Sequence, residues 1–108
     1  MFNVLDNLIK VIKKRKKYSI NISYTSFLLS KGRLFVSKKL NEEFLELIEA
    51  VKKNNKKNII HESADLIYHF LVLLEINNIK LKKILLELKK RQNQSGIEEK
   101  KNRKKNVR

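Results

Sequence analysis

Two stretches of this chain, Lys39–Ala50 (KLNEEFLELIEA) and His61–Leu74 (HESADLIYHFLVLL), constrain its fold more than any other part. Six of the eleven acidic residues fall inside them, although the chain carries a formal net charge of +15. Residues three and four positions apart share one face of a helix. This spacing places Glu42, Glu46 and Glu49 on one stripe. Both stretches are therefore predicted to be helices that concentrate carboxylates.

The acidic stripe of the first stretch, with Glu43 at its edge, differs from an ordinary solvated helix face. Like charges three or four residues apart destabilise a helix by roughly 0.2–0.5 kcal/mol per pair. In a lysine-rich chain a solvated face would alternate glutamate with lysine, yet in this stretch only Lys38 and Lys39, at its start, stand four residues before an acid. The pattern favours a cation supplied from outside the helix. The alternative is an acidic surface that offsets the basic exterior. The opposite face is apolar, with Leu40, Phe44, Leu47, Ile48 and Val51.

The second stretch is apolar on nearly every side, which is typical of a helix buried in a bundle. Its Glu62 and Asp65 are three residues apart and share a face, and His69 continues that stripe. Carboxylates on such a helix are costly unless they are paired or bind a metal ion. Two helices that each present a carboxylate pair can surround one hard cation, and oxygen ligands suit Mg²⁺ or Mn²⁺. We expect His69 to be a hydrogen-bonded core residue rather than a ligand, and we assign His61 no role.

The apolar periodicity predicts an all-α fold, a helical bundle of four main helices plus a short one. Thr25 or Ser26 is expected to cap the short helix, and Gly32 to end it. The apolar surface exceeds what one chain of this size covers, so we expect a homodimer. Residues 1–95 form the expected domain, and residues 96–108 a basic, disordered tail. The expected helices are Phe2 to about Lys17, Ser26–Lys31, about Leu34 to Lys53, about Ile59 to Ile76, and Lys80–Arg91, with Leu81, Ile84, Leu85 and Leu88 facing inward.

Composition excludes several classes of function. The chain has no cysteine, so it has neither a disulfide framework nor thiol chemistry, which is compatible with a cytoplasmic location. No apolar run approaches the ~18 residues needed to span a membrane, and the N-terminus does not resemble a signal peptide. The basic runs lack the interleaved aromatic residues that stack on bases, so we expect no specific nucleic-acid binding.

The acidic residues themselves carry a family resemblance. The pattern E-E-x-x-E (Glu42, Glu43, Glu46), followed after fifteen residues by E-x-x-D (Glu62, Asp65), resembles the MazG-like all-α nucleotide pyrophosphohydrolases. The run ADLIYHFLVLL is more specific, because it resembles the A-D-L-x-Y-H-x-L-V-L-L motif of the phosphoribosyl-ATP pyrophosphatases of histidine biosynthesis. Further matches, within a resemblance that covers about Val4 to Arg103, are Ser23-Tyr24-Thr25 with Leu28 and Gly32, Lys39 in K-x-x-E-E, and Leu88, Arg91 and the segment from Ser95 to Lys100.

This resemblance implies Mg²⁺-dependent hydrolysis of 1-(5-phosphoribosyl)-ATP to 1-(5-phosphoribosyl)-AMP and pyrophosphate, the second step of L-histidine biosynthesis, with Mn²⁺ as a possible substitute. It also implies a homodimer. The implied metal ligands are Glu43, Glu46, Glu62 and Asp65. Glu42 and Glu46 are the implied catalytic residues, with Glu42 serving a second metal position or orienting the attacking water. The implied substrate contacts are Lys39, Tyr24 and Thr25.

Alternatives to these roles stay open. Lys39 lies four residues before Glu43 and could form a salt bridge with it instead of binding phosphate. Tyr24 could be a packed core aromatic residue. For the whole chain, one alternative is a MazG-like pyrophosphohydrolase of another nucleotide, which the S-Y-T and Y-H-x-L-V-L-L matches disfavour. The other is a basic helical protein that binds RNA or a partner, which leaves the clustered acids unexplained. Since the chain has no glycine-rich phosphate loop, phosphate would have to be held by metal and basic side chains.

Overall fold

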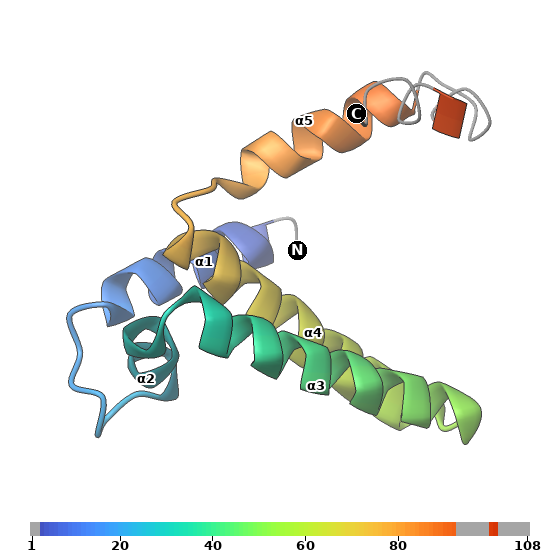
Figure 1. The fold of residues 1–108 in the computed structure, drawn as a ribbon, viewed down its shortest axis with the longest axis horizontal. Helices are drawn as coiled ribbons and strands as arrows, with labels where there is room; N and C mark the ends of the chain where they lie inside the picture. The colour runs from blue at the N-terminus through green and yellow to red at the C-terminus, as the bar shows by residue number, and fades with distance from the viewer. Residues whose placement is uncertain (1–2, 93–99, 102–108) are drawn as a thin grey trace.

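In the computed structural model, which describes residues 3–92 and 100–101, the chain is helical with no strand in those residues (Figure 1). This confirms the predicted all-α fold of four main helices and a short one. The expected tail of residues 96–108 lies outside the described residues, apart from Lys100 and Lys101. In chain order the helices are α1 (Asn3–Arg15), α2 (Tyr24–Lys31), α3 (Arg33–Lys52), α4 (Lys56–Ile76) and α5 (Leu81–Arg91).

The two longest helices, α3 and α4, form an antiparallel pair that runs side by side (Figure 1). The turn between them is shorter than the predicted Asn54–Asn58, because α4 begins at Lys56. Asn54 has a φ of 52°, and the Asn55 side chain accepts a hydrogen bond from the backbone N–H of Asn58 at 3.1 Å. A side-chain acceptor at this position satisfies one of the free first-turn amides and sets where the helix starts.

The short helix α2 is capped two to three residues earlier than predicted. The Ser23 hydroxyl accepts from the backbone N–H of Ser26 at 3.2 Å, so the expectation that Thr25 or Ser26 is the cap was wrong. Ser23 has the extended backbone that a capping residue needs, whereas the next residues are already helical. Gly32 joins α2 to α3 with a φ of 88°. A Cβ atom built there would meet nothing within 4 Å, so the backbone angle, rather than space, is what requires glycine.

The core lies where α1, α2, the start of α3 and the second half of α4 meet. Each fully buried aliphatic side chain contributes about 1.5–3 kcal/mol to stability. Lys16, just after α1, pairs with Glu75 near the end of α4, with 2.5 Å between Nζ and Oε2. The core cluster consists of Ile12, Leu28, Val36, Leu71, Val72 and Leu74.

Other apolar surfaces are less covered than the sequence predicted. Leu81 and Ile84 at the start of α5 pack against the core, but Leu85 and Leu88 are half exposed, so the inward face predicted for the whole helix was wrong. The reason is that α5 extends away from the α3–α4 pair after its first turn (Figure 1). The α4 helix is likewise not buried on every side, since Ile60 is 71% exposed.

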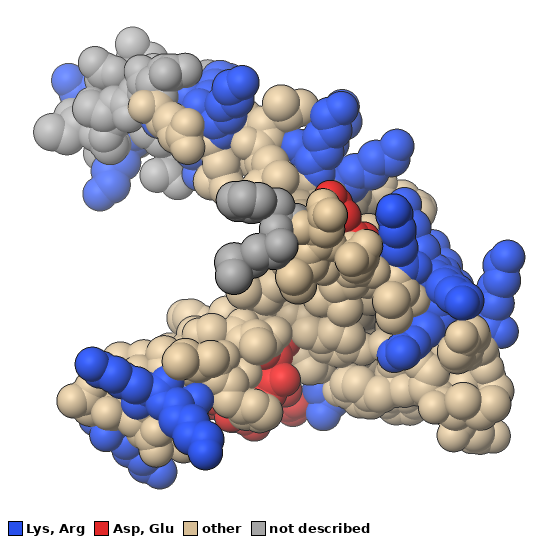
Figure 2. Space-filling model, turned by 180° about the vertical axis from the view of Figure 1, so that it is seen from behind, with Lys and Arg blue, Asp and Glu red and all other residues tan. Residues whose placement is uncertain are grey.

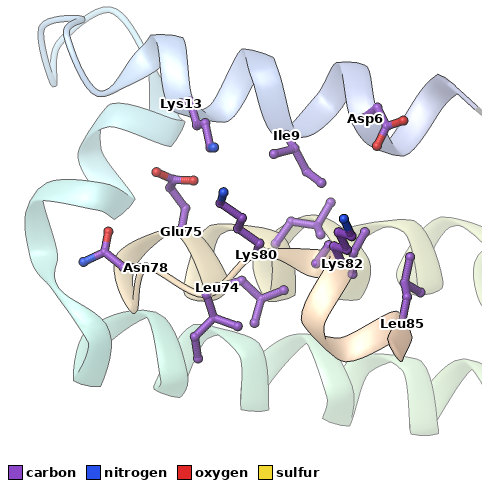
Figure 3. A pocket seen from close by; sticks show the side chains of 12 residues that line it. Asp6, Ile9, Lys13, Leu74, Glu75, Asn78, Lys80, Lys82 and Leu85 are labelled. Atoms are coloured by element: carbon purple, nitrogen blue, oxygen red, sulfur yellow. The ribbon is translucent and has the colours of Figure 1, made fainter. Parts of the chain in front are cut away.

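A cavity of about 600 Å³ lies between α1, the end of α4 and the start of α5 (Figure 3). Its lining is mainly aliphatic, with Lys13, Lys80 and Lys82 at its polar positions together with Asp6 and Glu75. An apolar groove of about 480 Å³ separately runs along the outer side of α3 and α4. No helix in the described part of the chain is long and apolar enough to cross a membrane.

Candidate metal site between α3 and α4

The carboxylates predicted to bind metal converge where α3 and α4 lie side by side. Glu43 and Glu46 of α3 and Glu62 of α4 each place a carboxylate oxygen within 4.8 Å of the others. A second group, formed by His61, Glu62 and Asp65, meets the same limit. All four predicted ligands therefore gather in two groups that share Glu62. On the face seen in Figure 2, acidic side chains form a recessed patch among uncharged residues, with basic side chains at its edges.

Two oxygens of this site are buried without a hydrogen bond. Neither Glu43 Oε2 nor Glu62 Oε2 has a partner among the described residues. Burial, followed by the neighbouring Glu46 carboxylate, raises the pKa of Glu43 above its usual value of 4.5. Burial and interaction with Glu46 also raise the pKa of Glu62. Unpaired buried carboxylate oxygens are costly, so this arrangement fits a cation that would satisfy both. Oxygen ligands from several carboxylates are the set that Mg²⁺ and Mn²⁺ favour.

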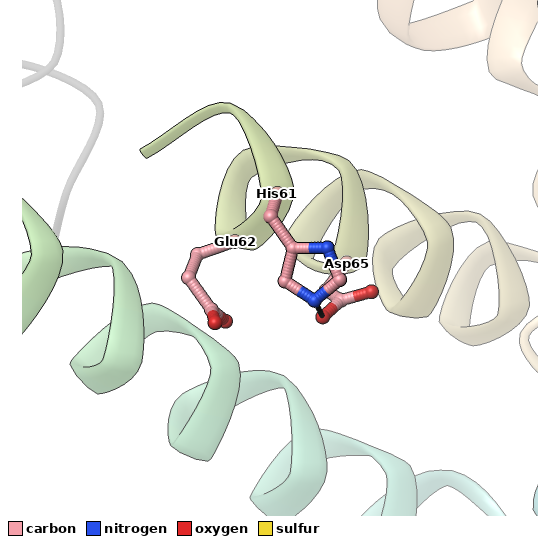
Figure 4. Close-up of side chains that lie close together, drawn as sticks. All are labelled: His61, Glu62 and Asp65. Atoms are coloured by element: carbon pink, nitrogen blue, oxygen red, sulfur yellow. Dashed lines mark ion pairs between the residues drawn. The ribbon is translucent and has the colours of Figure 1, made fainter. Parts of the chain in front are cut away.

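His61 belongs to the site, although the sequence reasoning gave it no role. Its Nε2 lies 3.4 Å from Asp65 Oδ2, one turn further along α4 (Figure 4). The signal was present in the sequence, because residues 61 and 65 have the i,i+4 spacing that brings side chains together. In Figure 4 the Glu62 side chain points toward α3, whereas the His61–Asp65 pair lies beside it on α4. One α4 turn thus supplies a carboxylate to each group.

Lys39 pairs with a different acid from the one that its spacing suggested. Its Nζ lies 3.2 Å from Glu42 Oε2, three residues away, so the alternative of a bridge to Glu43 was wrong. The Glu43 carboxylate instead takes part in the group between the helices. The hydrogen bond and charge of Glu42 raise the pKa of Lys39. Glu42 itself is exposed and outside both groups, so its catalytic role and the phosphate contact of Lys39 stay predictions.

His69 and Tyr24 link α2 to α4 next to this site. His69 is buried, its Nδ1 lies 2.8 Å from the Asp65 carbonyl oxygen, and its Nε2 lies 3.2 Å from the Tyr24 hydroxyl. The expectation of a hydrogen-bonded core histidine is therefore confirmed. Tyr24 is half exposed, and burial raises its pKa against the opposing charge of Lys39. Its exposure leaves the predicted substrate contact of Tyr24 open.

Thr25, the other predicted substrate contact on α2, lies in a different environment. It is buried, and its hydroxyl forms a hydrogen bond with the Tyr68 hydroxyl. The next residue, Ser26, donates its hydroxyl to the Arg15 carbonyl oxygen. The first turn of α2 therefore uses its polar side chains to hold the helix against its neighbours. A substrate contact from Thr25 stays a prediction.

The site can bind a divalent cation and, through it, a polyphosphate, because a metal neutralises charge on phosphate oxygens without a phosphate-binding loop. The cavity between α1 and α5 lacks such a ligand set. Its acidic residues, Asp6 and Glu75, stand among aliphatic and lysine side chains, and Glu75 lies more than three turns of α4 away from Glu62.

Comparison with known proteins supplies the remaining evidence. Residues 5–92 match the family described as phosphoribosyl-ATP pyrophosphohydrolase. The chain is 45% identical over 104 residues to the histidine biosynthesis bifunctional protein HisIE of Helicobacter hepaticus, covering 96% of this chain and 45% of that protein. It is 41% identical over 99 residues to the phosphoribosyl-ATP pyrophosphatase of Allorhizobium ampelinum, covering 92% of this chain and 95% of the relative. With that of Clostridium acetobutylicum it shares 48% identity over 88 residues, 82% of this chain and 80% of the relative.

The chain thus spans about half of the bifunctional relative and most of the two shorter ones. The matched segment includes α1 from Leu5 onward, all of α2 to α5, and every acidic residue of the two groups. These matches confirm the family that the sequence motifs indicated. The chain belongs to the phosphoribosyl-ATP pyrophosphohydrolase family.

Proposed function

We propose that this protein hydrolyses phosphoribosyl-ATP to phosphoribosyl-AMP and pyrophosphate, and that it requires a divalent metal ion, Mg²⁺ or Mn²⁺. The observation that carries this proposal is the convergence of Glu43, Glu46 and Glu62 from two helices, with two of their buried oxygens unpaired among the described residues. A family of pyrophosphohydrolases has a direct use for such a group, since its substrates carry several phosphate charges.

Glu43, Glu46, Glu62 and Asp65 are the residues that would hold the ion. When bound, the ion would supply neutralisation of the phosphate oxygens in the transition state. Lys39, which pairs with Glu42 on an exposed part of α3, would contact phosphate after exchanging this intramolecular pair. Glu42 would then be released to accept a hydrogen bond from the attacking water, the catalytic role that the motif implies. Glu46 has a carboxylate oxygen within 4.8 Å of those of Glu43 and Glu62. It would bind the ion with them and could also help to orient the attacking water.

We also propose that the active protein is a homodimer that covers its exposed apolar surface. The groove on the outer side of α3 and α4 includes Phe44 and Ile67, each 48% exposed, and the second half of α5 adds Leu85 and Leu88. Exposed apolar surfaces of this kind are typical of subunit interfaces. Replacing Ile67 by Asp should give a monomer in sedimentation experiments. A wild-type protein that is already monomeric at micromolar concentration would contradict the proposal.

We further propose that the catalytic domain ends at about residue 95. The family match stops at residue 92, and the following segment is strongly basic. Deletion of residues 101–108 should therefore leave turnover nearly unchanged while it removes any weak, salt-dependent affinity for nucleic acid.

Because the chain needs no disulfide, we propose that it works in the cytoplasm.

Pyrophosphate release from phosphoribosyl-ATP, compared with release from the ordinary nucleoside triphosphates, tests the proposed activity. We expect turnover of phosphoribosyl-ATP with Mg²⁺ and loss of turnover with a chelator. Preference for an ordinary triphosphate would instead favour a pyrophosphohydrolase of another nucleotide. No release from any nucleotide, with the metal present and the protein folded, would contradict the proposal.

A further inference from the structure

Adjacent residues in the first turn of α2 bond to adjacent residues of α4. Tyr24 bonds to His69, and Thr25 bonds to Tyr68. The His69 ring also makes edge contacts with the rings of Tyr24 and Tyr68, with centroids 5.9 and 5.2 Å apart. The two links differ in one respect that bears on function. The Thr25–Tyr68 link is part of the buried packing, whereas the Tyr24 ring is 51% exposed.

The direction of the hydrogen bonds through His69 follows from the Asp65 carbonyl. A carbonyl oxygen can only accept, so His69 Nδ1 carries the proton in the 2.8 Å bond. In this tautomer Nε2 carries no proton and accepts, and the Tyr24 hydroxyl donates to it across 3.2 Å. The hydroxyl proton of Tyr24 is therefore used in the bond to His69. Toward a bound molecule, the Tyr24 oxygen can act only as a hydrogen-bond acceptor.

The tyrosine held in this way lies at the edge of the candidate metal site. Its hydroxyl lies 3.2 Å from Nε2 of His69, and after burial the charges of Lys39 and Glu43 have the largest effects on its pKa. The other end of the His69 ring is fixed to the backbone of Asp65, whose carboxylate belongs to the acidic group. One buried imidazole thus joins the metal-binding turn of α4 to an exposed side chain of α2.

We propose that His69 is a positioning residue that holds Tyr24 at the site as a hydrogen-bond acceptor for a hydroxyl group of the nucleotide substrate. This inference rests on the proposed nucleotide hydrolysis and deepens it. An acceptor oxygen fits a sugar hydroxyl and repels phosphate oxygens, which have no proton to donate at neutral pH. Tyr24 therefore recognises a ribose hydroxyl of the substrate, and the phosphates lie toward the metal and Lys39.

Two substitutions of His69 separate its two hydrogen bonds. In His69→Gln the side-chain oxygen can reach the position of Nε2 and accept from Tyr24, but the bond to Asp65 is lost. In His69→Asn the side-chain nitrogen can replace Nδ1 and keep the Asp65 bond, but nothing accepts from Tyr24. Positioning of Tyr24 predicts that KM for phosphoribosyl-ATP rises about three- to tenfold in His69→Asn, the effect of one hydrogen bond, and stays near the wild-type value in His69→Gln.

Tyr24→Phe should raise KM as His69→Asn does, with little change in kcat. The double variant that combines Tyr24→Phe with His69→Asn should have a KM no higher than that of either single variant. Tyr68→Phe is the matched control, because it removes the neighbouring link between the same helices without touching His69 Nε2. Its KM should not change. Equal KM in all variants, or a rise in His69→Gln and Tyr68→Phe as large as in His69→Asn, would overturn the inference and leave His69 with a purely structural role.

A second readout does not depend on turnover. In ¹⁵N NMR spectra of the wild-type protein, His69 should show the tautomer protonated at Nδ1, and Tyr24→Phe should shift its Nε2 resonance. A proton on Nε2, or an unchanged resonance in Tyr24→Phe, would overturn the inference even in a protein that hydrolyses phosphoribosyl-ATP. If the wild-type protein failed to hydrolyse any nucleotide while the NMR link was present, the proposed function would fall and the link would remain.

Discussion

The two halves of α4 show how the same helix carries function and stability in different places. The first half, residues 56–65, is largely exposed and bears His61, Glu62 and Asp65. The second half, residues 66–76, supplies the buried His69, Leu71, Val72 and Leu74. The first half faces α3 through carboxylates that repel one another, whereas the second half packs into the aliphatic core. A costly site is tolerated because the adjoining turns of the same helix hold it in place.

The largest expected effect comes from the first half. Glu62→Gln removes the carboxylate shared by both groups while it keeps the shape of the side chain. We expect pyrophosphate release to fall by roughly 10²-fold or more, because a lost ligand weakens the charge stabilisation at phosphorus. Asp65→Asn should act in the same direction. The fold without metal should be unchanged or slightly more stable, since one repelling charge is gone.

Glu75→Gln provides the control for these variants on the other half of α4. Glu75 bonds to Lys16 and lies outside both acidic groups, so its loss should reduce stability by about 1–2 kcal/mol and leave turnover intact. Turnover that survives in Glu62→Gln, or that falls equally in Glu75→Gln, would show that the acidic groups are structural.

Truncation in the second half should have the opposite signature. Leu71 is 4% exposed and lies in the core cluster, so Leu71→Ala should lower the free energy of unfolding by about 2–5 kcal/mol. Metal affinity of the fraction that remains folded should not change. Denaturant unfolding combined with metal titration at low temperature measures both quantities. A loss of metal affinity without a loss of stability would place Leu71, unexpectedly, in the site.

A smaller effect concerns pH in the absence of metal. Burial raises the pKa of Glu43 and of Glu62, so the folded state holds these protons more tightly than the unfolded state does. Their contribution to stability is complete below about pH 4.5 and is lost as the pH rises through the raised values. Glu43→Gln should therefore stabilise the chelated protein at pH 7, and the gain should shrink toward pH 4. Urea unfolding across this range would contradict the assignment if the gain grew on acidification.

Sequence reasoning predicted the all-α fold because helical spacing of apolar and acidic residues is a local property that one chain shows directly. It also predicted the acids that converge, since Glu43, Glu46, Glu62 and Asp65 have spacings that place them on matching helix faces. It missed the role of Ser23 because Thr25 and Ser26, close behind it, are also residue types that cap helices. Only the backbone conformation decides between them.

Other differences depended on tertiary contacts that spacing cannot report. Lys39 has acids both three and four residues ahead, and it pairs with Glu42 because Glu43 is engaged with α4. The His69 link to Tyr24 joins residues 45 positions apart, so no local pattern could predict it. The direction of α5 follows from the turn at Asn78, whose φ is 55°. The amphipathic sequence of α5 indicates only that some apolar surface should cover Leu85 and Leu88.

Binding of Mn²⁺ to the purified protein at neutral pH, followed by electron paramagnetic resonance, tests the central claim most directly. The wild-type protein should bind the ion, Glu62→Gln should bind it much more weakly, and Glu75→Gln should bind it as the wild type does. Equal Mn²⁺ affinity in the wild-type protein and in Glu62→Gln would contradict the claim that the carboxylates between α3 and α4 form the metal site.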